Sequence, residues 1–222
     1  MMKKGALFAA LILVLVYSSC APSRYVRPLG KKQQAVNASF GGPMIGFAGT
    51  VIPVPLTSFS YGYGIDSLTT VYGNLHTTSL LYGVFQTDIG LCREFYHAPC
   101  GLGLSGNLSG NFTFDRWEHH FRAWPELDLN VYKTYNSRGS FVYAGADAWF
   151  ELSRFRAHQQ PQNVHVIFNP HLGVQFVKTK WNFQLEGKFI APNISSLPNV
   201  VDYKGIGGRG AIGIYFGVYR LF

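Results

Sequence analysis

Apolar and polar residues alternate along most of this chain. The stretch AIGIYFGVYRLF at its end places Ile212, Ile214 and Phe216 on one parity, and Ala211 and Gly213 on the other. The stretches GLGLSGNLSGNFTF and WNFQLEGKFIA alternate in the same way. A period of two is typical of β-strands, because successive side chains of a strand point to opposite faces. The pattern therefore predicts a chain built of strands.

Ten runs of this kind are predicted, and no amphipathic helix is predicted between them. There is no internal repeat and no linker to a second domain, so the runs belong to one all-β domain. They lie near residues 35–48, 56–65, 68–80, 83–92, 101–114, 121–135, 140–152, 164–178, 180–191 and 208–222.

The kind of polar residue indicates which face of the strands meets water. The polar faces carry mostly Gly, Ser, Asn, Thr and Tyr, whereas a solvated surface is normally rich in Lys and Glu. Charged residues make up 14% of the chain, against about 25% in typical domains. This favours a transmembrane barrel with a polar lumen, which must close because lipid leaves no backbone group unpaired. A soluble barrel of the lipocalin kind is the alternative.

The lengths of the predicted connections support a membrane barrel. Short links are expected at 66–67, 136–139 and 179–180, and long ones at 115–120, 153–163 and 192–207. Outer-membrane barrels have short periplasmic turns, long outer loops and an even number of strands. We therefore expect a single antiparallel up-and-down barrel of about ten strands with periplasmic termini, eight or twelve being the alternatives. Pro53 and Pro55 suit a loop or an edge.

The first residues of the chain have the features of an export signal. Lys3 and Lys4 precede the apolar run 6–16, and two serines follow before Cys20. A basic region, a short apolar region and small residues at the cut describe a secretory signal. The run is too short to cross a bilayer as a helix.

The Ser-Ser-Cys ending of this segment resembles the lipobox of bacterial lipoproteins. The resemblance implies cleavage before Cys20 and acylation of its side chain, whereas an ordinary signal peptide with an incidental cysteine is the alternative. The expected organisation is a signal peptide over 1–19, a lipidated periplasmic leader over 20–34 and the barrel domain over 35–222.

The net charge of the chain is +8, and loss of Lys3 and Lys4 with the signal peptide leaves 8 − 2 = +6. A nucleic-acid-binding protein would place its charge in a readable stripe, and no such partner is predicted. Four basic residues follow the expected anchor instead. This placement suits an anionic lipid surface, although it is equally compatible with a solvated leader. They are Arg24, Arg27, Lys31 and Lys32.

The final run resembles the C-terminal signature of outer-membrane β-barrel proteins. In that family the last residue is aromatic, usually Phe, and apolar residues recur at alternate positions before it. Phe222, Val218 and Phe216 match this pattern, and Arg220 departs from it. The resemblance implies that Phe222 is an assembly signal read by the barrel-assembly machinery. With the lipobox, it implies outer-membrane lipids and the lipoprotein-export machinery as partners.

Charged residues on the polar faces are expected to point into the lumen. Ionisable groups at membrane depth are costly and need partners, so we predict a salt-bridged network that closes the barrel. A cation-leaning pore or proton path is the alternative, because six acids face three bases. The residues are Asp88, Glu126, Asp128, Asp147, Glu151, Glu186, Arg122, Lys188 and Arg209, with His76, His165 and His171 on the same faces.

Three short motifs contain residues that could carry chemistry. Cys92 and Cys100 flank REFYHAP between two predicted strands, and in an oxidising envelope they either form a disulfide or remain free thiols. GLGLSG at 101–106 fits G-x-G-x-x-G, but a strand follows where a dinucleotide site needs a helix, so its glycines are expected to relieve crowding. DRWEHHF at 115–121 could bind a metal ion, and a solvated loop is favoured. No catalytic residues, cofactor or metal are predicted.

Three classes of function remain compatible with the sequence. The favoured one is a non-catalytic outer-membrane barrel lipoprotein with a structural, surface-interaction or narrow-pore role. The second is an outer-membrane lipid-modifying enzyme or protease, although no His is followed by Ser two residues later, as in the deacylases that share this fold. The third is a soluble lipocalin-like lipoprotein that binds an apolar ligand.

Overall fold

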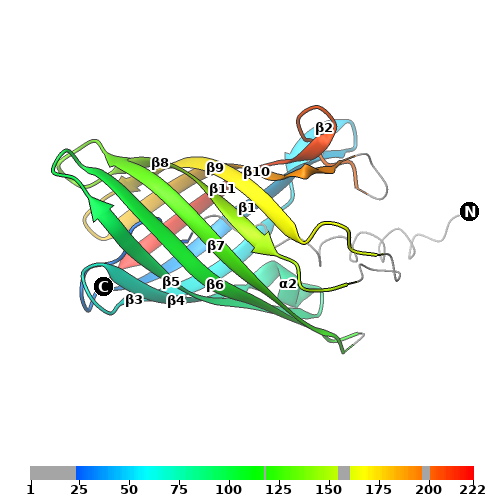
Figure 1. Ribbon diagram of the computed structural model, residues 1–222, viewed down its shortest axis with the longest axis horizontal. Coiled ribbons are helices and arrows are strands. Elements are labelled where there is room, and N and C mark those ends of the chain that lie inside the picture. Colours follow the sequence, from blue (N-terminus) through cyan, green and yellow to red (C-terminus); the bar gives the residue numbers. More distant parts are fainter. Residues whose placement is uncertain (1–23, 118, 155–160, 197–200) are drawn as a thin grey trace, which may run out of the picture.

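Ten antiparallel strands form a closed barrel, as the sequence predicted (Figure 1). The computed structural model describes residues 24–117, 119–154, 161–196 and 201–222. Residue pairs from Ala35 with Leu221 to Pro43 with Gly213 join the first and last strands and close the cylinder. The barrel strands are β1 (Gln34–Phe47), β3 (Leu56–Gly64), β4 (Thr69–His76), β5 (Val84–His97), β6 (Leu102–Asp115), β7 (Phe121–Thr134), β8 (Phe141–Phe150), β9 (Val166–Val177), β10 (Trp181–Ser195) and β11 (Arg209–Leu221).

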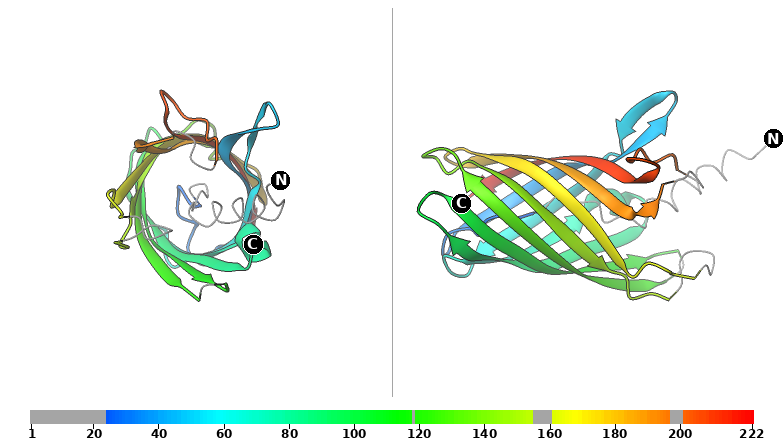
Figure 2. Two further views of the ribbon diagram at one scale, coloured as in Figure 1. Left: turned by 90° about the vertical axis from the view of Figure 1, so that its right-hand side faces the viewer. Right: turned by 45° about the horizontal axis from the view of Figure 1, so that its top comes forward.

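The remaining strand, β2 (Thr50–Pro53), lies outside the cylinder. It pairs with Met44–Phe47 of β1, and this hairpin extends beyond one end of the barrel (Figure 2). Ile45 also forms a bridge with Tyr203 from the connection before β11. β2 ends at Pro53, in agreement with the edge position expected for this proline, which has no N–H to donate to a ladder.

Three strands differ clearly in length from the prediction, β4, β5 and β10, the last of which ends at Ser195 rather than at residue 191. The helix α2 (Thr77–Leu81) follows β4 directly, so the expectation of strand up to residue 80 and of no helix is wrong at this turn. The Thr57 hydroxyl, hydrogen-bonded to those of Thr77 at 2.7 Å and Thr78 at 2.8 Å, fixes the turn against β3. In contrast, β5 continues past the predicted end at residue 92 as far as His97, with a bulge between Glu94 and Tyr96.

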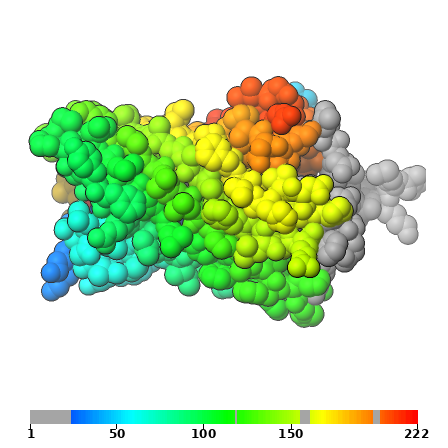
Figure 3. Space-filling model, viewed as in Figure 1, coloured from blue at the N-terminus to red at the C-terminus, as the bar shows by residue number. Residues whose placement is uncertain are grey.

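The barrel is apolar outside and polar inside. Ile89 and Leu172 on the outer wall are 63% and 67% exposed, whereas Asp88 and Asn111 inside are 0% exposed. In the space-filling view, the atoms of β6–β8 form an outer surface without gaps (Figure 3). A soluble barrel hides its apolar face, so this arrangement is the reverse of the lipocalin kind and is that of a membrane barrel.

Among the described residues, no helix is long and apolar enough to span a bilayer.

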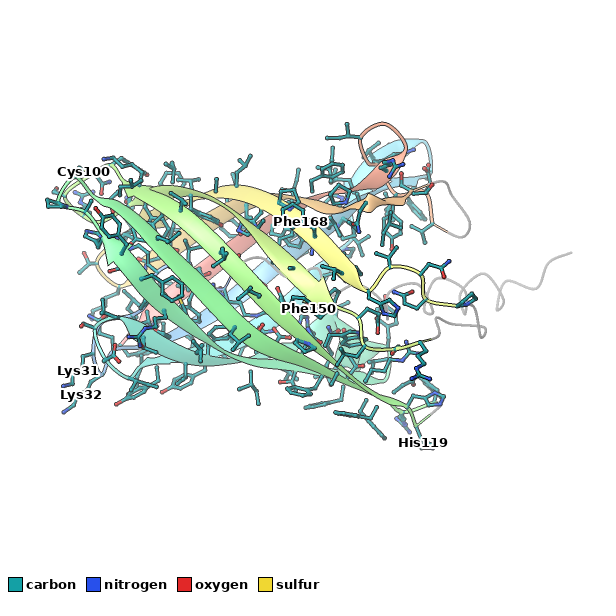
Figure 4. All side chains as sticks on the ribbon, in the orientation of Figure 1. Lys31, Lys32, Cys100, His119, Phe150 and Phe168 are labelled. Atoms are coloured by element: carbon teal, nitrogen blue, oxygen red, sulfur yellow. The ribbon has the colours of Figure 1, made fainter. Side chains whose placement is uncertain are left out.

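The two ends of the barrel differ in their connections. Links 65–68, 98–101, 135–140 and 178–180 lie at the end where β1 begins and β11 finishes; we call it the short-turn end. Links 116–120, 151–165 and 196–208 lie at the opposite, long-loop end. Figure 4 labels Lys31, Lys32 and Cys100 at the first end and His119 at the second. The alternation of short and long links predicted from the sequence is confirmed.

Candidate functional site: a plugged lumen

Residues Arg24–Gly30 run inside the barrel before β1 begins, and we call this segment the plug (Figure 2). Four hydrogen bonds fix its backbone and its first aromatic side chain to the wall. The Tyr219 hydroxyl donates to the Arg24 carbonyl, and the Ser105 hydroxyl donates to the Val26 carbonyl. The Leu29 N–H donates to the Thr70 hydroxyl at 2.7 Å, and the Tyr25 hydroxyl donates to the Ala35 carbonyl at 3.4 Å.

The placement of the plug corrects one expectation from the sequence. Arg24 is buried inside the lumen and Arg27 is half-buried, so neither faces a lipid surface. Lys31 and Lys32 remain exposed at the short-turn end. Parity along strands could not reveal this, because the leader has no alternating pattern of its own.

Aromatic side chains pack around Tyr25, the second residue of the plug. Its ring lies 5.6 Å from that of Tyr72 and 5.7 Å from that of Tyr219, between centroids. Gly62 of β3 makes the space: a Cβ there would lie 2.5 Å from Cζ of Tyr25. Such offset aromatic contacts add to the burial of apolar area. A side chain at position 62 is therefore incompatible with the seated plug.

The next part of the plug meets a second aromatic group. Val26, 0% exposed, packs with Tyr132, Phe141 and Tyr143. The guanidinium carbon of Arg27 lies 5.0 Å from the ring centroid of Tyr132 and 5.6 Å from that of Phe141, within the range of a cation–π interaction.

Gly103, in the GLGLSG stretch of β6, makes room for one of these rings. A Cβ there would lie 2.1 Å from Cζ of Tyr132. The predicted role of these glycines in relieving crowding is therefore confirmed at Gly103.

An ion cluster joins the plug to β5. The Arg24 guanidinium pairs with the Asp88 carboxylate, which also lies 2.7 Å from Nε2 of His76 and accepts a hydrogen bond of 2.9 Å from Asn111. Arg24, His76 and Asp88 are all buried. Asp88 was expected to face inward. Its partner Arg24 precedes β1, so the alternation along the strands could not predict this pair.

A second ion cluster lies between β8 and β10. The Lys188 ammonium is 2.7 Å from Asp147 and 3.8 Å from Glu186. The Tyr143 hydroxyl donates to Glu186 at 2.7 Å, and the Asn169 amide donates to Asp147. These charges, each expected to point into the lumen, form a hydrogen-bonded set that is buried.

A third cluster surrounds Asp128 of β7. Its carboxylate accepts hydrogen bonds from Asn107 at 3.0 Å and Asn130 at 2.9 Å. Nε2 of His171 lies 3.6 Å from Asp128, and Nδ1 of the same ring lies 3.9 Å from Asp147. His171 therefore connects this cluster to the one around Lys188.

The other predicted lumen residues occupy less enclosed positions. Glu126, Arg122 and Glu151 are half-buried, and Glu151 accepts a hydrogen bond of 2.7 Å from the Trp124 indole.

Arg209 and His165 do not belong to the lumen, and their assignment by parity was wrong. Both side chains are exposed. Arg209 pairs with Ser195 beyond a shift in the β10–β11 register, and the next residue, Gly210, has φ +57°, so the alternation breaks there. His165 precedes β9.

The charge of the lumen is negative. Seven inward acids, Asp88, Glu94, Glu126, Asp128, Asp147, Glu151 and Glu186, face Arg24, Arg27, Arg122 and Lys188. Their formal sum is −7 + 4 = −3 with neutral histidines.

The two cysteines of the described chain are free thiols rather than a disulfide. Cys92 is buried within β5 opposite Asn107, and Cys100 is exposed in the turn after that strand. Five residues of strand at about 3.3 Å each separate Cys92 from His97, about 16 Å, whereas bridged Cα atoms lie within about 7 Å. A hydrogen bond from the backbone of Leu102 and the nearby Lys133 ammonium lower the pKa of the Cys100 thiol.

The remaining sequence candidates lie at the chain ends and in the loop after β6. In the described part of the molecule, no three His, Cys, Asp or Glu side chains are placed to hold a metal ion; Glu118 of the DRWEHHF motif lies outside it, as do Cys20 and residues 1–19. Phe222 donates its N–H to the Gln34 carbonyl at 2.9 Å, beside the seam that closes the barrel. Its role as an assembly signal stays a prediction.

Comparison with solved structures agrees with this architecture. The COG4313 outer membrane channel from Pseudomonas putida F1 is 8% identical and matches with a TM-score of 0.52 over 91% of this chain and 100% of the channel. The chain has the fold of an outer-membrane β-barrel.

Two further solved structures are similar to this chain. The translocator domain of autotransporter NalP from Neisseria meningitidis is 11% identical, with a TM-score of 0.48 over 98% of this chain and 97% of that one. The NanC porin is 11% identical, with a TM-score of 0.46 over 84% of this chain and 98% of that one. No protein-family model and no curated protein matches the chain.

Proposed function

We propose that this protein is a non-catalytic outer-membrane barrel whose lumen is sealed by its own N-terminal segment. The observation that carries the proposal is the ion pair between Arg24 of the plug and Asp88 of β5, buried inside the barrel. Ten strands enclose little more than their own side chains, because a barrel of about eight is already filled. Tyr25 and Val26 occupy part of what remains. A solute would have to displace a buried ion pair to pass.

A sealed barrel acts through its surfaces rather than through its lumen. At the long-loop end, the β1–β2 hairpin carries the exposed side chains Phe47 and Val51 beyond the rim. Exposed apolar groups on a projecting element favour contact with another surface. This supports a structural or surface-interaction role.

The second candidate is a narrow, cation-leaning path that opens when the plug moves. The net charge of −3 on the inward side chains favours this alternative, since a negatively lined passage attracts cations. The two candidates differ in a single measurable property, the conductance of the intact chain.

Planar-bilayer recording of the refolded protein tests the proposal. We expect no steady conductance from the wild type. Gly62→Val should open a leak, because its side chain would occupy the position of the Tyr25 ring. Gly187→Val is the matched control: it adds the same side chain to β10, where a Cβ meets nothing within 4 Å.

Steady conductance from the wild type, equal to that of Gly62→Val, would favour the open path and contradict the sealed barrel. Heat-modifiable gel mobility confirms that each variant is folded before recording. Cation selectivity of the leak in Gly62→Val would agree with the acidic lumen.

We further propose that the short-turn end faces the periplasm and contacts anionic lipid headgroups. Eight exposed basic residues gather there against two acids, Asp66 and Glu94. A basic residue near an anionic lipid surface contributes about 1 kcal/mol. The Arg220 guanidinium also lies 5.2 Å from the ring of Trp181, a pairing suited to a membrane interface. The eight are Lys31, Lys32, Arg93, Lys133, Arg138, Lys178, Lys180 and Arg220.

A lipid anchor at Cys20 would be compatible with this orientation. Arg24 follows Cys20 by four positions, and an extended chain spans these four steps in at most about 14 Å. The Arg24 carbonyl accepts a hydrogen bond from Tyr219, which lies two residues before the end of β11 at the short-turn end. We therefore propose that acylated Cys20 holds the plug to the periplasmic leaflet.

One thiol-labelling experiment examines anchor and orientation together. Intact cells are treated with a membrane-impermeant maleimide, and the protein is analysed by mass spectrometry. The mature N-terminus should be acylated Cys20. Cys100 should be labelled only after the outer membrane is permeabilised, and buried Cys92 only after unfolding. An unmodified N-terminus elsewhere would remove the anchor, and labelling of Cys100 on intact cells would reverse the orientation. The variant His119→Cys is the surface control, and its new thiol should be labelled on intact cells.

A further inference from the structure

A cavity of about 250 Å³ lies at the long-loop end of the lumen, over β8–β11. Its lining is mainly apolar and includes Trp149, Ile167, Ile190, Ile194 and Tyr203, with Lys188 among the polar members. The described residues that line it include none from the plug, so this cavity is a separate place in the molecule.

At this cavity the inward faces of the strands change from polar to apolar. Trp149 and Ile190 each stand two residues beyond a lumen charge, Asp147 and Lys188 respectively, and so face the same side of the wall. Trp149 pairs across the strands with Ile167, and Ile190 pairs with Ala211. An apolar layer therefore lies directly above the polar layer that contains the second ion cluster.

An irregularity in β10 provides the room. Ile190 pairs with Ala211, and the next pair is Ser195 with Arg209, so residues 191–194 bulge out of the ladder. Ala191 has φ +50°, and its freed N–H donates to the Asn169 side chain at 2.8 Å. Bulges of this kind bend a strand and are common at barrel rims and next to binding sites.

The size of the cavity sets the size of a ligand. A protein cavity of about 150 Å³ holds one benzene molecule, so 250 Å³ accommodates an apolar group of about ten carbon atoms on the same scale. An apolar cavity open to the watery mouth of a barrel gains from being filled by such a group.

The floor of the cavity sets the chemistry of the head group. Lys188 lies on this floor, and Asp147 at 2.7 Å and Glu186 at 3.8 Å accompany its charge. The three formal charges sum to +1 − 2 = −1, which disfavours a carboxylate or phosphate. An uncharged polar head group is the kind that fits.

We infer that this cavity binds a neutral amphiphile, with an apolar tail of about ten carbon atoms and an uncharged polar head group at the floor formed by Lys188, Asp147 and Glu186. The tail lies among Trp149, Ile167, Ile190 and Ile194. The inference does not depend on whether the lumen conducts, because the cavity opens toward the long-loop end.

Tryptophan fluorescence of the full mature chain in nanodiscs tests the inference with bromine-labelled decanol as the probe. Wild type should show saturable quenching above that of empty nanodiscs. Trp149→Phe should lose most of this signal, because the ring beside the ligand is removed. Ile194→Asn should weaken the midpoint at least about tenfold, since an unpaired amide would face the tail. Ile206→Asn is the control, since Ile206 is 61% exposed and does not line the cavity.

The head group is tested by competition. Decanol should displace the probe, and decanoate should do so at least about tenfold less well because of the acidic floor. Quenching that is not saturable, or that is unchanged in Ile194→Asn and Trp149→Phe, would overturn the site. Decanoate as the better competitor would overturn the neutral head group.

Discussion

Arg24→Ala is expected to destabilise the barrel by about 3–5 kcal/mol, the usual cost of breaking a buried ion pair by removing one partner. The variant leaves Asp88, which is 0% exposed, without the guanidinium that neutralises it. It also loosens the plug, since Arg24 is the residue through which the plug reaches β5. Unfolding in urea, followed by heat-modifiable gel mobility, measures the change.

The control for Arg24→Ala is Arg154→Ala, an exposed arginine in the loop after β8, where the effect of a single surface charge is small. The double variant Arg24→Ala/Asp88→Ala should be more stable than the sum of the two single effects predicts, because it leaves no unpaired charge. Equal losses for Arg24→Ala and Arg154→Ala would show that the ion pair contributes little.

Lys188→Met is expected to have an effect of similar size, about 3–5 kcal/mol. Lys188 is buried between Asp147 and Glu186, so its removal leaves two carboxylates facing each other. Lowering the pH should restore part of the lost stability in this variant, because protonation removes the repulsion. The readout is urea unfolding at two pH values.

Lys204→Met is the control for Lys188→Met, because it removes a lysine from an ion pair that is exposed rather than buried. Lys204 pairs with Asp202 at 2.6 Å, nearly the distance of the Lys188–Asp147 pair, but its side chain is 41% exposed and that of Asp202 is 48% exposed. Exposed pairs contribute about 0–1 kcal/mol. If the two variants lose the same stability, burial is not what gives the lumen pair its strength.

The sequence alone predicted a barrel of about ten strands whose apolar faces meet lipid. The reason is physical: an outer wall in hydrocarbon and a lumen of polar side chains impose a period of two on every strand. Lys188 and Glu186 could be assigned to the lumen because they stand two residues apart on one strand. Asp147 and Asp128 followed by the same parity on their own strands.

The tertiary structure decided everything that the period of two does not encode. The plug has no alternating pattern, and Arg24 meets Asp88 only because the closed barrel brings residues far apart in the sequence together. The extension of β5 past Cys92 rests on its pairing with β6, which separates Cys92 from Cys100. Arg209 lies outside the lumen because the pairing of β10 with β11 shifts just before it. The same shift makes room for the cavity beside Ile190. The size of that cavity depends on how β10 pairs with β11, which the residue types alone do not reveal.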